Sequence, residues 1–237
     1  MKLALFDLDH TLLPIDSADT WSHFLVRAAG LDAEEYGARI RHFAATYKNG
    51  NFDIEGYLAF QMNLLARFPR PQLESWRDNF VRVHVAPHVR PEAIQLIARH
   101  RADGFVLALV TGTHAFVSRA IADLFGIEHL LAVVPEEAQG RFTGRYVGTH
   151  TYQEGKVRAV QAFLAARGTT LARCEDSIFY SDSINDLPLL EAVRHPVVTN
   201  GDTRLRAIAA QRGWPMLDLF DLHHSDGQAM QEQRVGS

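Results

Sequence analysis

Two short apolar runs, each followed at once by a polar residue, constrain the fold of this chain more than any other feature. Phe105–Val110 contains no polar residue and is followed by Thr111, and Leu3–Phe6 is followed by Asp7. An uninterrupted apolar run of this length is typical of a strand that is buried on both faces of a parallel sheet. The sequence therefore predicts an α/β protein in which these polar residues stand at the carboxyl ends of parallel strands.

Between these two runs, the spacing of apolar residues changes from that of a strand to that of a helix. Residues 15–87 contain four stretches with apolar residues three or four positions apart, and no strand pattern among them. The last stretch places Leu73, Trp76, Phe80 and Val83 on one side. Together with Trp21 and Phe24, the aromatic residues Trp76 and Phe80 are more typical of a bundle core than of a substrate cage.

The second half of the chain alternates between helices and strands. The later strands are predicted at Leu130–Val134, Ser177–Tyr180 and Pro196–Val198, with a hairpin within Gln139–Val147. One strand, four helices and then this alternation indicate a doubly wound, mostly parallel, Rossmann-like sheet with a helical insertion. We expect a core domain of residues 1–14 and 88–222, a helical cap of residues 15–87, and a polar tail of residues 223–237.

Four groups of polar residues follow predicted strands or begin predicted helices. They are Asp7 with Asp9, Thr111 with Gly112, Lys156, and Asp182 with Asn185 and Asp186. In open α/β sheets, residues at the carboxyl ends of parallel strands meet at one edge, where ligands bind. Taken alone, each group is also typical of a turn or a helix cap. Their occurrence together favours one site.

The charges expected at this site predict its ligands. Two unit charges about 4 Å apart repel by roughly 4 kcal/mol at an effective dielectric constant near 20, so four carboxylates require a cation or partial protonation. The groups offer oxygen ligands without histidine or cysteine spacing, which favours Mg²⁺ over zinc. Lys156, the Thr111 hydroxyl and backbone amides at helix N-termini also suit a phosphate dianion.

The composition limits the partners of the chain. The formal net charge is −4, so there is no basic excess for nucleic-acid binding. Asp7 and Asp9 interrupt the N-terminal apolar run before a signal-peptide core could form, and residues 105–110 are too few to span a bilayer. The single cysteine, Cys174, suits a reducing compartment. We expect a cytoplasmic protein that acts on a small phosphorylated metabolite; the sequence does not indicate its oligomeric state.

In order along the chain, the four groups resemble the four motifs of the haloacid dehalogenase (HAD) superfamily of phosphohydrolases. Residues 7–12 carry the first motif, residues 182–186 the last, and Thr111 and Lys156 lie between them. The insertion directly after the first motif resembles the mobile cap of that superfamily. Within the superfamily, the chain is similar to the phosphoserine phosphatase-like subfamily IB.

The resemblance implies a chemical role for each motif residue. Asp7 is implied as the nucleophile that forms an aspartyl-phosphate, and Asp9 as the general acid and then the general base. Thr111 and Lys156 are implied to hold and neutralise the phosphoryl oxygens. The other phosphate- or substrate-binding residues implied are Leu8, Gly112, Asn185 and Asp16.

The resemblance also implies Mg²⁺ as the cofactor. Asp182 is implied as a direct ligand, and Asp7 and the backbone carbonyl of Asp9 as further ligands. Asp186 is implied to act either on the metal through a bound water or by orienting Lys156. The function expected is therefore that of a Mg²⁺-dependent phosphatase acting on a small phosphomonoester.

The cap residues leave the substrate open. Similar phosphoserine phosphatases carry a glutamate early in the cap and an arginine deeper in it, which hold the amino acid; here Asp16 and Gln61 stand near these positions. An amide does not replace the charge of an arginine on a carboxylate, so phosphoserine is not the favoured substrate. His10 and His114 flank the site, where histidine is more often a packing residue. The alternative functions are a phosphoserine phosphatase, a receiver-like phospho-acceptor domain and a non-catalytic anion-binding protein.

Overall fold

A parallel sheet forms the centre of the computed structural model, which describes residues 1–49 and 51–220. In the described residues the sheet has six strands in the order β3-β2-β1-β6-β7-β8, and every neighbouring pair is parallel. These strands are β1 (Lys2–Phe6), β2 (Phe105–Val110), β3 (His129–Leu131), β6 (Asp176–Ser181), β7 (His195–Thr199) and β8 (Met216–Leu217). The predicted α/β fold is confirmed. The edge strand β8 was not predicted, and the expected tail lies outside the described residues.

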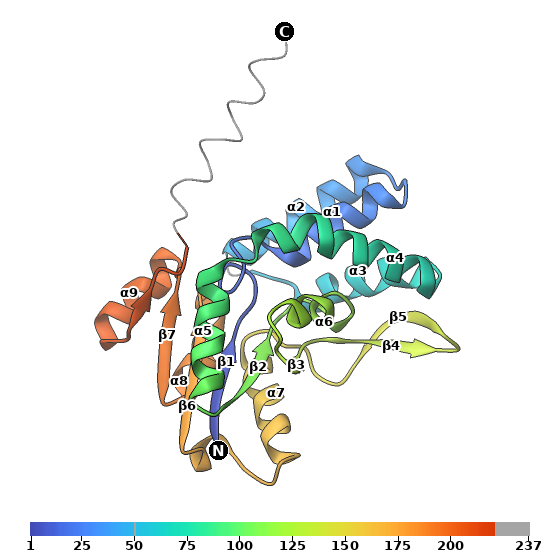
Figure 1. The fold of residues 1–237 in the computed structure, drawn as a ribbon. Helices are drawn as coiled ribbons and strands as arrows, with labels where there is room; N and C mark the ends of the chain where they lie inside the picture. Colours follow the sequence, from blue (N-terminus) through green and yellow to red (C-terminus); the bar gives the residue numbers. More distant parts are fainter. Residues whose placement is uncertain (50, 221–237) are drawn as a thin grey trace.

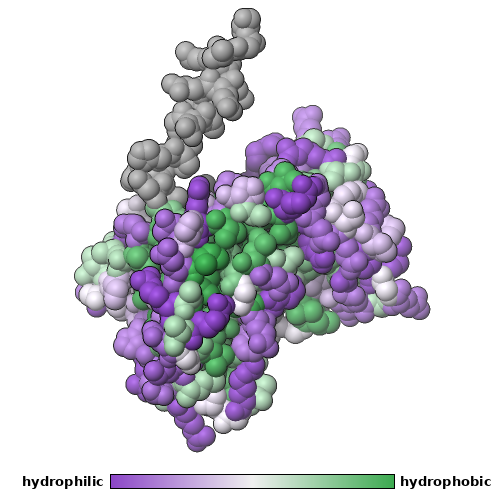
Figure 2. Space-filling view, in the orientation of Figure 1, coloured by the Kyte–Doolittle hydropathy of each residue, from purple (hydrophilic) through white to green (hydrophobic). Residues whose placement is uncertain are grey.

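The residues of each strand point alternately into two apolar layers. In β1, Ala4 and Phe6 belong to one buried cluster, and Leu3 and Leu5 belong to the other. Helices α5 (Pro91–Ala102) and α6 (Ala115–Leu124) pack in the first layer, and α7 (Glu154–Ala165), α8 (Leu187–Ala192) and α9 (Thr203–Arg212) pack in the second. Figure 2 shows a band of apolar surface down the side where α5 lies. The central strands β1 and β2 are almost entirely apolar because both faces of the sheet are covered.

Four helices lie between β1 and α5 and pack beside the sheet (Figure 1). They are α1 (Ser17–Ala28), α2 (Ala33–Asn49), α3 (Ile54–Ala66) and α4 (Arg70–Phe80). The rings of Phe24 and Phe80 lie 5.8 and 5.2 Å from Trp21, and all three side chains are buried, as expected of a bundle core. The exact boundaries of the cap and core stay a prediction. No described helix is long and apolar enough to cross a membrane.

The helical register changes after Phe80. Residues Val81–Val85 form a π-helical segment and Ala86–His88 a 3₁₀ turn before α5 begins. The extra residue per turn rotates the following side chains away from the face that Leu73 and Phe80 occupy. The prediction that Val83 shares this buried face is therefore wrong, since Val83 is 45% exposed.

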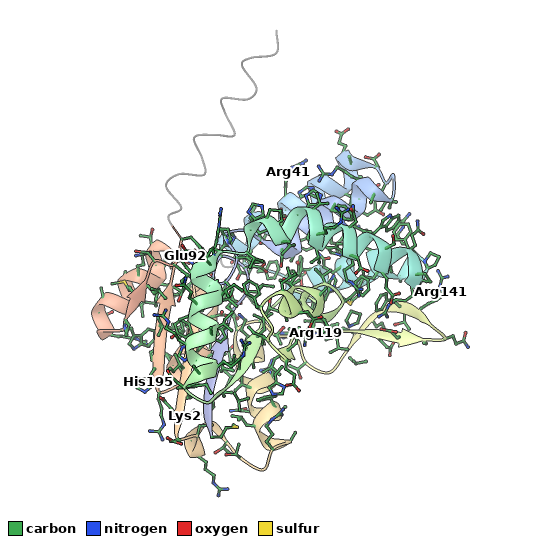
Figure 3. The ribbon with its side chains drawn as sticks, in the orientation of Figure 1. Lys2, Arg41, Glu92, Arg119, Arg141 and His195 are labelled. Carbon is green, nitrogen blue, oxygen red and sulfur yellow. The ribbon has the colours of Figure 1, made fainter. Side chains whose placement is uncertain are left out.

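A β-hairpin of the core packs against the cap. It consists of β4 (Val134–Ala138) and β5 (Arg141–Val147), so it begins before the predicted range, and the strand predicted at Leu130–Val134 ends at Leu131. The hairpin packs on α3, and the Tyr146 hydroxyl donates to the Glu55 carboxylate of that helix at 3.0 Å. Figure 3 shows Arg141 pointing outward from the hairpin tip. The predicted hairpin is confirmed, with its turn at Gln139 and Gly140.

The first turn of α7 depends on a glycine. A Cβ atom at Gly155 would lie 2.1 Å from the backbone oxygen of His150. We expect Gly155→Ala to lower the free energy of unfolding by about 1–3 kcal/mol, because the neighbouring backbone must move. Gly37→Ala within α2 is the matched control: its Cβ would meet only the end of the flexible Arg41 side chain, and it should raise stability by up to about 1 kcal/mol. Urea denaturation measures both, and wild-type stability of Gly155→Ala would contradict the prediction.

Candidate active site

The predicted site residues meet at the carboxyl edge of the sheet, where the strand order reverses. The chain runs from β1 outward to β3 on one side, and from β6 outward to β8 on the other. Asp7 directly follows β1, and its backbone N–H donates to the Tyr180 carbonyl of β6 at 2.9 Å. Asp182 directly follows β6. Such a reversal point opens a crevice for ligands in doubly wound sheets.

Lys156 connects two of the carboxylates. Its Nζ atom lies 2.6 Å from Asp7 Oδ1 and 2.6 Å from Asp186 Oδ2, and it is 4% exposed. Burial opposes the charge of Lys156, but the carboxylates of Asp186 and Asp7 outweigh it and raise the lysine pKa. Ser181 Oγ also donates to Asp186 Oδ2 at 2.7 Å. Lys156 is therefore a buried cation and not a solvated helix residue.

The Thr11 hydroxyl lies between Asp7 and Asp182. Its oxygen is 3.1 Å from Asp7 Oδ2 and 3.2 Å from Asp182 Oδ1, and it accepts from the Asp182 backbone N–H at 3.1 Å. One hydroxyl proton serves only one carboxylate at a time. Burial and the charges of Asp7 and Asp186 raise the pKa of Asp182 well above its ordinary value. The negative charge here thus exceeds what Lys156 alone neutralises.

Asp9 is held in place by the start of α1 and by the loop after β2. The Ser17 backbone N–H donates to Asp9 Oδ1 at 2.7 Å, and the Thr113 hydroxyl donates to Oδ2 at 2.8 Å. Burial and the nearby carboxylates of Asp16 and Asp7 raise the pKa of Asp9 to about 8. A carboxyl group in this environment can carry a proton near neutral pH and release it, as general acid–base chemistry requires.

The other predicted phosphate-binding residues, Thr111, Gly112 and Asn185, line the same cavity as Asp7. The Thr111 carbonyl accepts from Thr151 Oγ1 at 2.6 Å, and the Thr111 hydroxyl accepts from the Thr113 N–H at 3.1 Å. A Cβ at Gly112 would approach only Thr151 O, at 3.9 Å, so the backbone there stays open to a ligand. Asn185 Oδ1 accepts from the Tyr152 hydroxyl at 3.1 Å.

A cavity of about 660 Å³ brings most of these groups together. Its lining includes Asp7, Asp9, Asp16, Thr111, Gly112, Lys156, Asp182, Asn185 and Asp186. Leu8 is absent from the lining, and its side chain is fully buried, so only its backbone is available to a ligand. His10 lines the cavity, whereas His114 does not.

Sequence reasoning missed the hydroxyl groups that position the carboxylates. The hydroxyl groups of Thr11, Thr113 and Ser181 each donate to a predicted site residue, and Ser17 donates through its backbone N–H. Thr11 lies inside the first motif and Thr113 lies two residues after Thr111, so their closeness in sequence to the motif residues could have identified them as site residues. Ser17 and Ser181 carry no such signal, because serine at a helix start or a strand end is most often a cap.

The donor set suits Mg²⁺. Among the described residues, no three acidic, histidine or cysteine side chains converge as a complete metal site. Asp7 and Asp182 instead supply two carboxylates on either side of the Thr11 hydroxyl. Mg²⁺ is commonly bound by one or two carboxylates together with water and substrate phosphate, so it does not need a full protein cage. Asp186 is paired with Lys156, which fits the orienting role better than direct ligation.

Comparison with known proteins confirms the resemblance. A model of the haloacid dehalogenase-like hydrolase family matches residues 4–191. The chain is 37% identical over 219 residues to the histidinol-phosphatase of Neisseria meningitidis, covering 92% of this chain and 99% of that protein. It is 31% identical over 225 residues to a phosphoserine phosphatase of Mycobacterium tuberculosis, covering 91% of this chain and 70% of that one.

A solved structure shares the fold closely. The structure of a Bordetella pertussis protein of unknown function superposes with a TM-score of 0.88 and is 43% identical. The match covers 92% of this chain and 99% of that one.

His114 begins α6 next to the site and is buried without a polar partner. Among the described residues, neither ring nitrogen has a hydrogen-bond partner, and the ring stacks on Phe116 at 6.3 Å between centroids. Burial lowers the pKa of His114 from 6.5 to about 4. His114 is therefore a neutral packing residue at pH 7, as a lone histidine most often is.

This burial predicts a pH-dependent stability. Between pH 6.5 and 4 the unfolded chain binds a proton on His114 that the folded protein does not, so acid lowers the stability of the wild type. Between pH 7.5 and pH 5, the wild type should lose about 2 kcal/mol relative to His114→Phe, which has no such proton. Urea denaturation of both proteins at both pH values measures this difference, and parallel losses would contradict it.

Proposed function

The chain belongs to the haloacid dehalogenase-like hydrolase family, and on this premise we propose that it hydrolyses a small phosphomonoester through an aspartyl-phosphate formed on Asp7. The observation that carries the proposal is the position of Asp7. Its buried carboxylate follows the central strand, bonds to Lys156 and Thr11, and faces the same cavity as Thr111 and Gly112. The two relatives of this chain named above are both phosphatases, so hydrolysis of phosphate esters is the activity common to them.

The first half of the reaction forms the intermediate. An oxygen of Asp7 attacks phosphorus, so that a new oxygen–phosphorus bond forms and the bond from phosphorus to the oxygen of the leaving alcohol breaks. Asp9 gives its proton to that alcohol oxygen. Hydrogen bonds from Ser17 and Thr113 hold the Asp9 carboxyl group in position. Lys156 and the Thr111 hydroxyl stabilise the charge on the phosphoryl oxygens.

The second half releases phosphate. The Asp9 carboxylate takes a proton from a water molecule, which attacks phosphorus and breaks the bond to Asp7, so that both aspartates return to their starting forms. When bound, Mg²⁺ would neutralise negative charge on the phosphoryl group. Asp7, Asp182 and the Asp9 backbone carbonyl would hold the metal. Asp186 would orient Lys156, in agreement with their 2.6 Å contact.

The names of two relatives suggest two candidate substrates, and one other function of the site is a real alternative to hydrolysis. The relatives' names suggest phosphoserine and histidinol phosphate as candidates. A receiver-like phospho-acceptor domain also combines aspartates, a threonine and a lysine at the edge of a doubly wound sheet. The cap cavity directly above Asp7 favours an enzyme, because a cap that encloses the substrate can exclude bulk water. The cytoplasmic location stays a prediction.

Asp7→Asn tests the nucleophile. We expect the kcat for p-nitrophenyl phosphate with Mg²⁺ to fall by at least about a thousandfold, because an amide cannot form the intermediate. Asp123→Asn, the same change at an exposed residue of α6, is the matched control. Chelation by EDTA should abolish wild-type activity, and added Mg²⁺ should restore it. Similar rates for Asp7→Asn and wild type would contradict the proposal, and a stable phosphorylated Asp7 without turnover would favour the receiver-like alternative.

A further inference from the structure

The cavity above Asp7 is larger than a phosphate group requires, and its upper wall is aromatic. Phe43, Phe52, Tyr57 and Phe60 of the cap line it. Phe43 lies 5.4 Å from Tyr57 and 5.6 Å from Phe60, and Phe52 lies 5.2 Å from Tyr57, between ring centroids. We define these four residues as the aromatic wall. Rings arranged in this way favour a flat ring on the ligand, by stacking or by edge-to-face contact.

The wall meets a carboxylate at the start of α1. Asp16 is the N-cap of α1 and also lines the cavity. One of its oxygens accepts from the Asp19 N–H at 2.8 Å, which leaves acceptor capacity on the other. Asp16, Asp9 and the four residues of the aromatic wall line the same cavity. A protonated amine on the substrate can pair with the Asp16 carboxylate.

The cap offers no matching cation. Among the described lining residues, the cap contributes no arginine, lysine or histidine to the cavity. Arg39 lies 4.7 Å above the Phe60 ring but does not line the cavity, and Figure 3 shows Arg41 on the outer side of the cap, away from the sheet. Gln61 is buried in the lining and donates to Ser22 Oγ at 2.7 Å. A substrate carboxylate held here would lose water without gaining a charged partner, which is costly.

The core cations do not change this balance. Lys156 is engaged by Asp7 and Asp186. Arg204 also lines the cavity, but its side chain is 55% exposed at the start of α9 and lies 3.8 Å from Asp202. The cap side of the cavity is thus acidic and aromatic.

We propose that this cavity selects phosphate esters of amino alcohols that carry a flat ring, with Asp16 pairing with the ammonium group and the aromatic wall holding the ring. The proposal rests on the phosphatase function above and adds its specificity. Esters that carry a carboxylate beside the amine, phosphoserine among them, are poor substrates.

Matched esters separate the contributions. The reference is 2-amino-3-phenylpropyl phosphate, together with its imidazole counterpart, histidinol phosphate. 3-Phenylpropyl phosphate lacks the amine, 2-aminopropyl phosphate lacks the ring, and phosphoserine adds a carboxylate. In the wild type, we expect kcat/KM to fall about 10- to 100-fold on loss of the amine, as for a hydrogen bond to a charged group. Loss of the ring should cost at least about tenfold, and phosphoserine should fall below 2-aminopropyl phosphate.

Two variants assign these preferences to residues. Asp16→Asn keeps an N-cap of equal quality, and should reduce the ratio of kcat/KM for the amine-bearing to the amine-free ester to within about threefold of unity. Asp32→Asn is the matched control, because Asp32 caps the start of α2 by accepting from the Glu34 and Glu35 N–H groups and does not line the cavity; it should keep the wild-type ratio. Phe52→Leu should reduce the preference for the ring, whereas Phe68→Leu, outside the cavity, should keep it.

The outcomes distinguish this proposal from the function on which it rests. Failure to hydrolyse p-nitrophenyl phosphate or any ester would overturn the phosphatase function itself. Normal hydrolysis of p-nitrophenyl phosphate with equal kcat/KM for the amine-bearing and amine-free esters would overturn only the specificity. An unchanged amine preference in Asp16→Asn, or phosphoserine equal to the reference ester, would also overturn it.

Discussion

The buried ion pairs of Lys156 are the interaction on which the rest of the site depends. Asp7 and Asp186 each lie 2.6 Å from its Nζ atom, and all three residues are less than a tenth exposed. Removing one partner of such a pair typically costs about 3–5 kcal/mol, because the other charge stays buried. The charged residues that the proposed reaction uses therefore also stabilise the structure of the site. Gly155, which approaches His150 closely at the start of α7, directly precedes this lysine.

The reversal of strand order brings distant parts of the chain to that lysine. Asp7 follows β1 and Asp186 follows β6, and these strands are hydrogen-bonded neighbours although about 170 residues separate them. Lys156 comes from the helix before β6. The same edge leaves an excess of carboxylates around Asp182, and an excess of this kind attracts a hard divalent cation. The sheet thus determines both the phosphate side and the metal side of the site.

The fold and the charged residues could be predicted from the sequence because their signals are local. The apolar run at Phe105–Val110 predicts a buried strand whatever surrounds it, and the polar residue after it must stand at the edge of the sheet. The bond from the Ser17 backbone N–H to Asp9 has no such signal, because it depends on where the start of the cap lies relative to Asp9 in the folded protein. Val83 was misplaced for a related reason, since a π-helical turn changes the register without a clear sequence mark.

The cap shows why chemistry was easier to predict than specificity. Phe60 and Phe80 both stand at helical spacing in amphipathic helices and are almost fully buried, yet only Phe60 lines the cavity. Periodicity identifies the inner face of a helix but not whether that face meets another helix or a ligand. A charged residue is more informative here, because Asp16 is an exposed N-cap of α1 that also lines the cavity, where its carboxylate favours a cationic group on the ligand. The acidic residue beside the aromatic wall is therefore more informative about the substrate than the aromatic residues themselves.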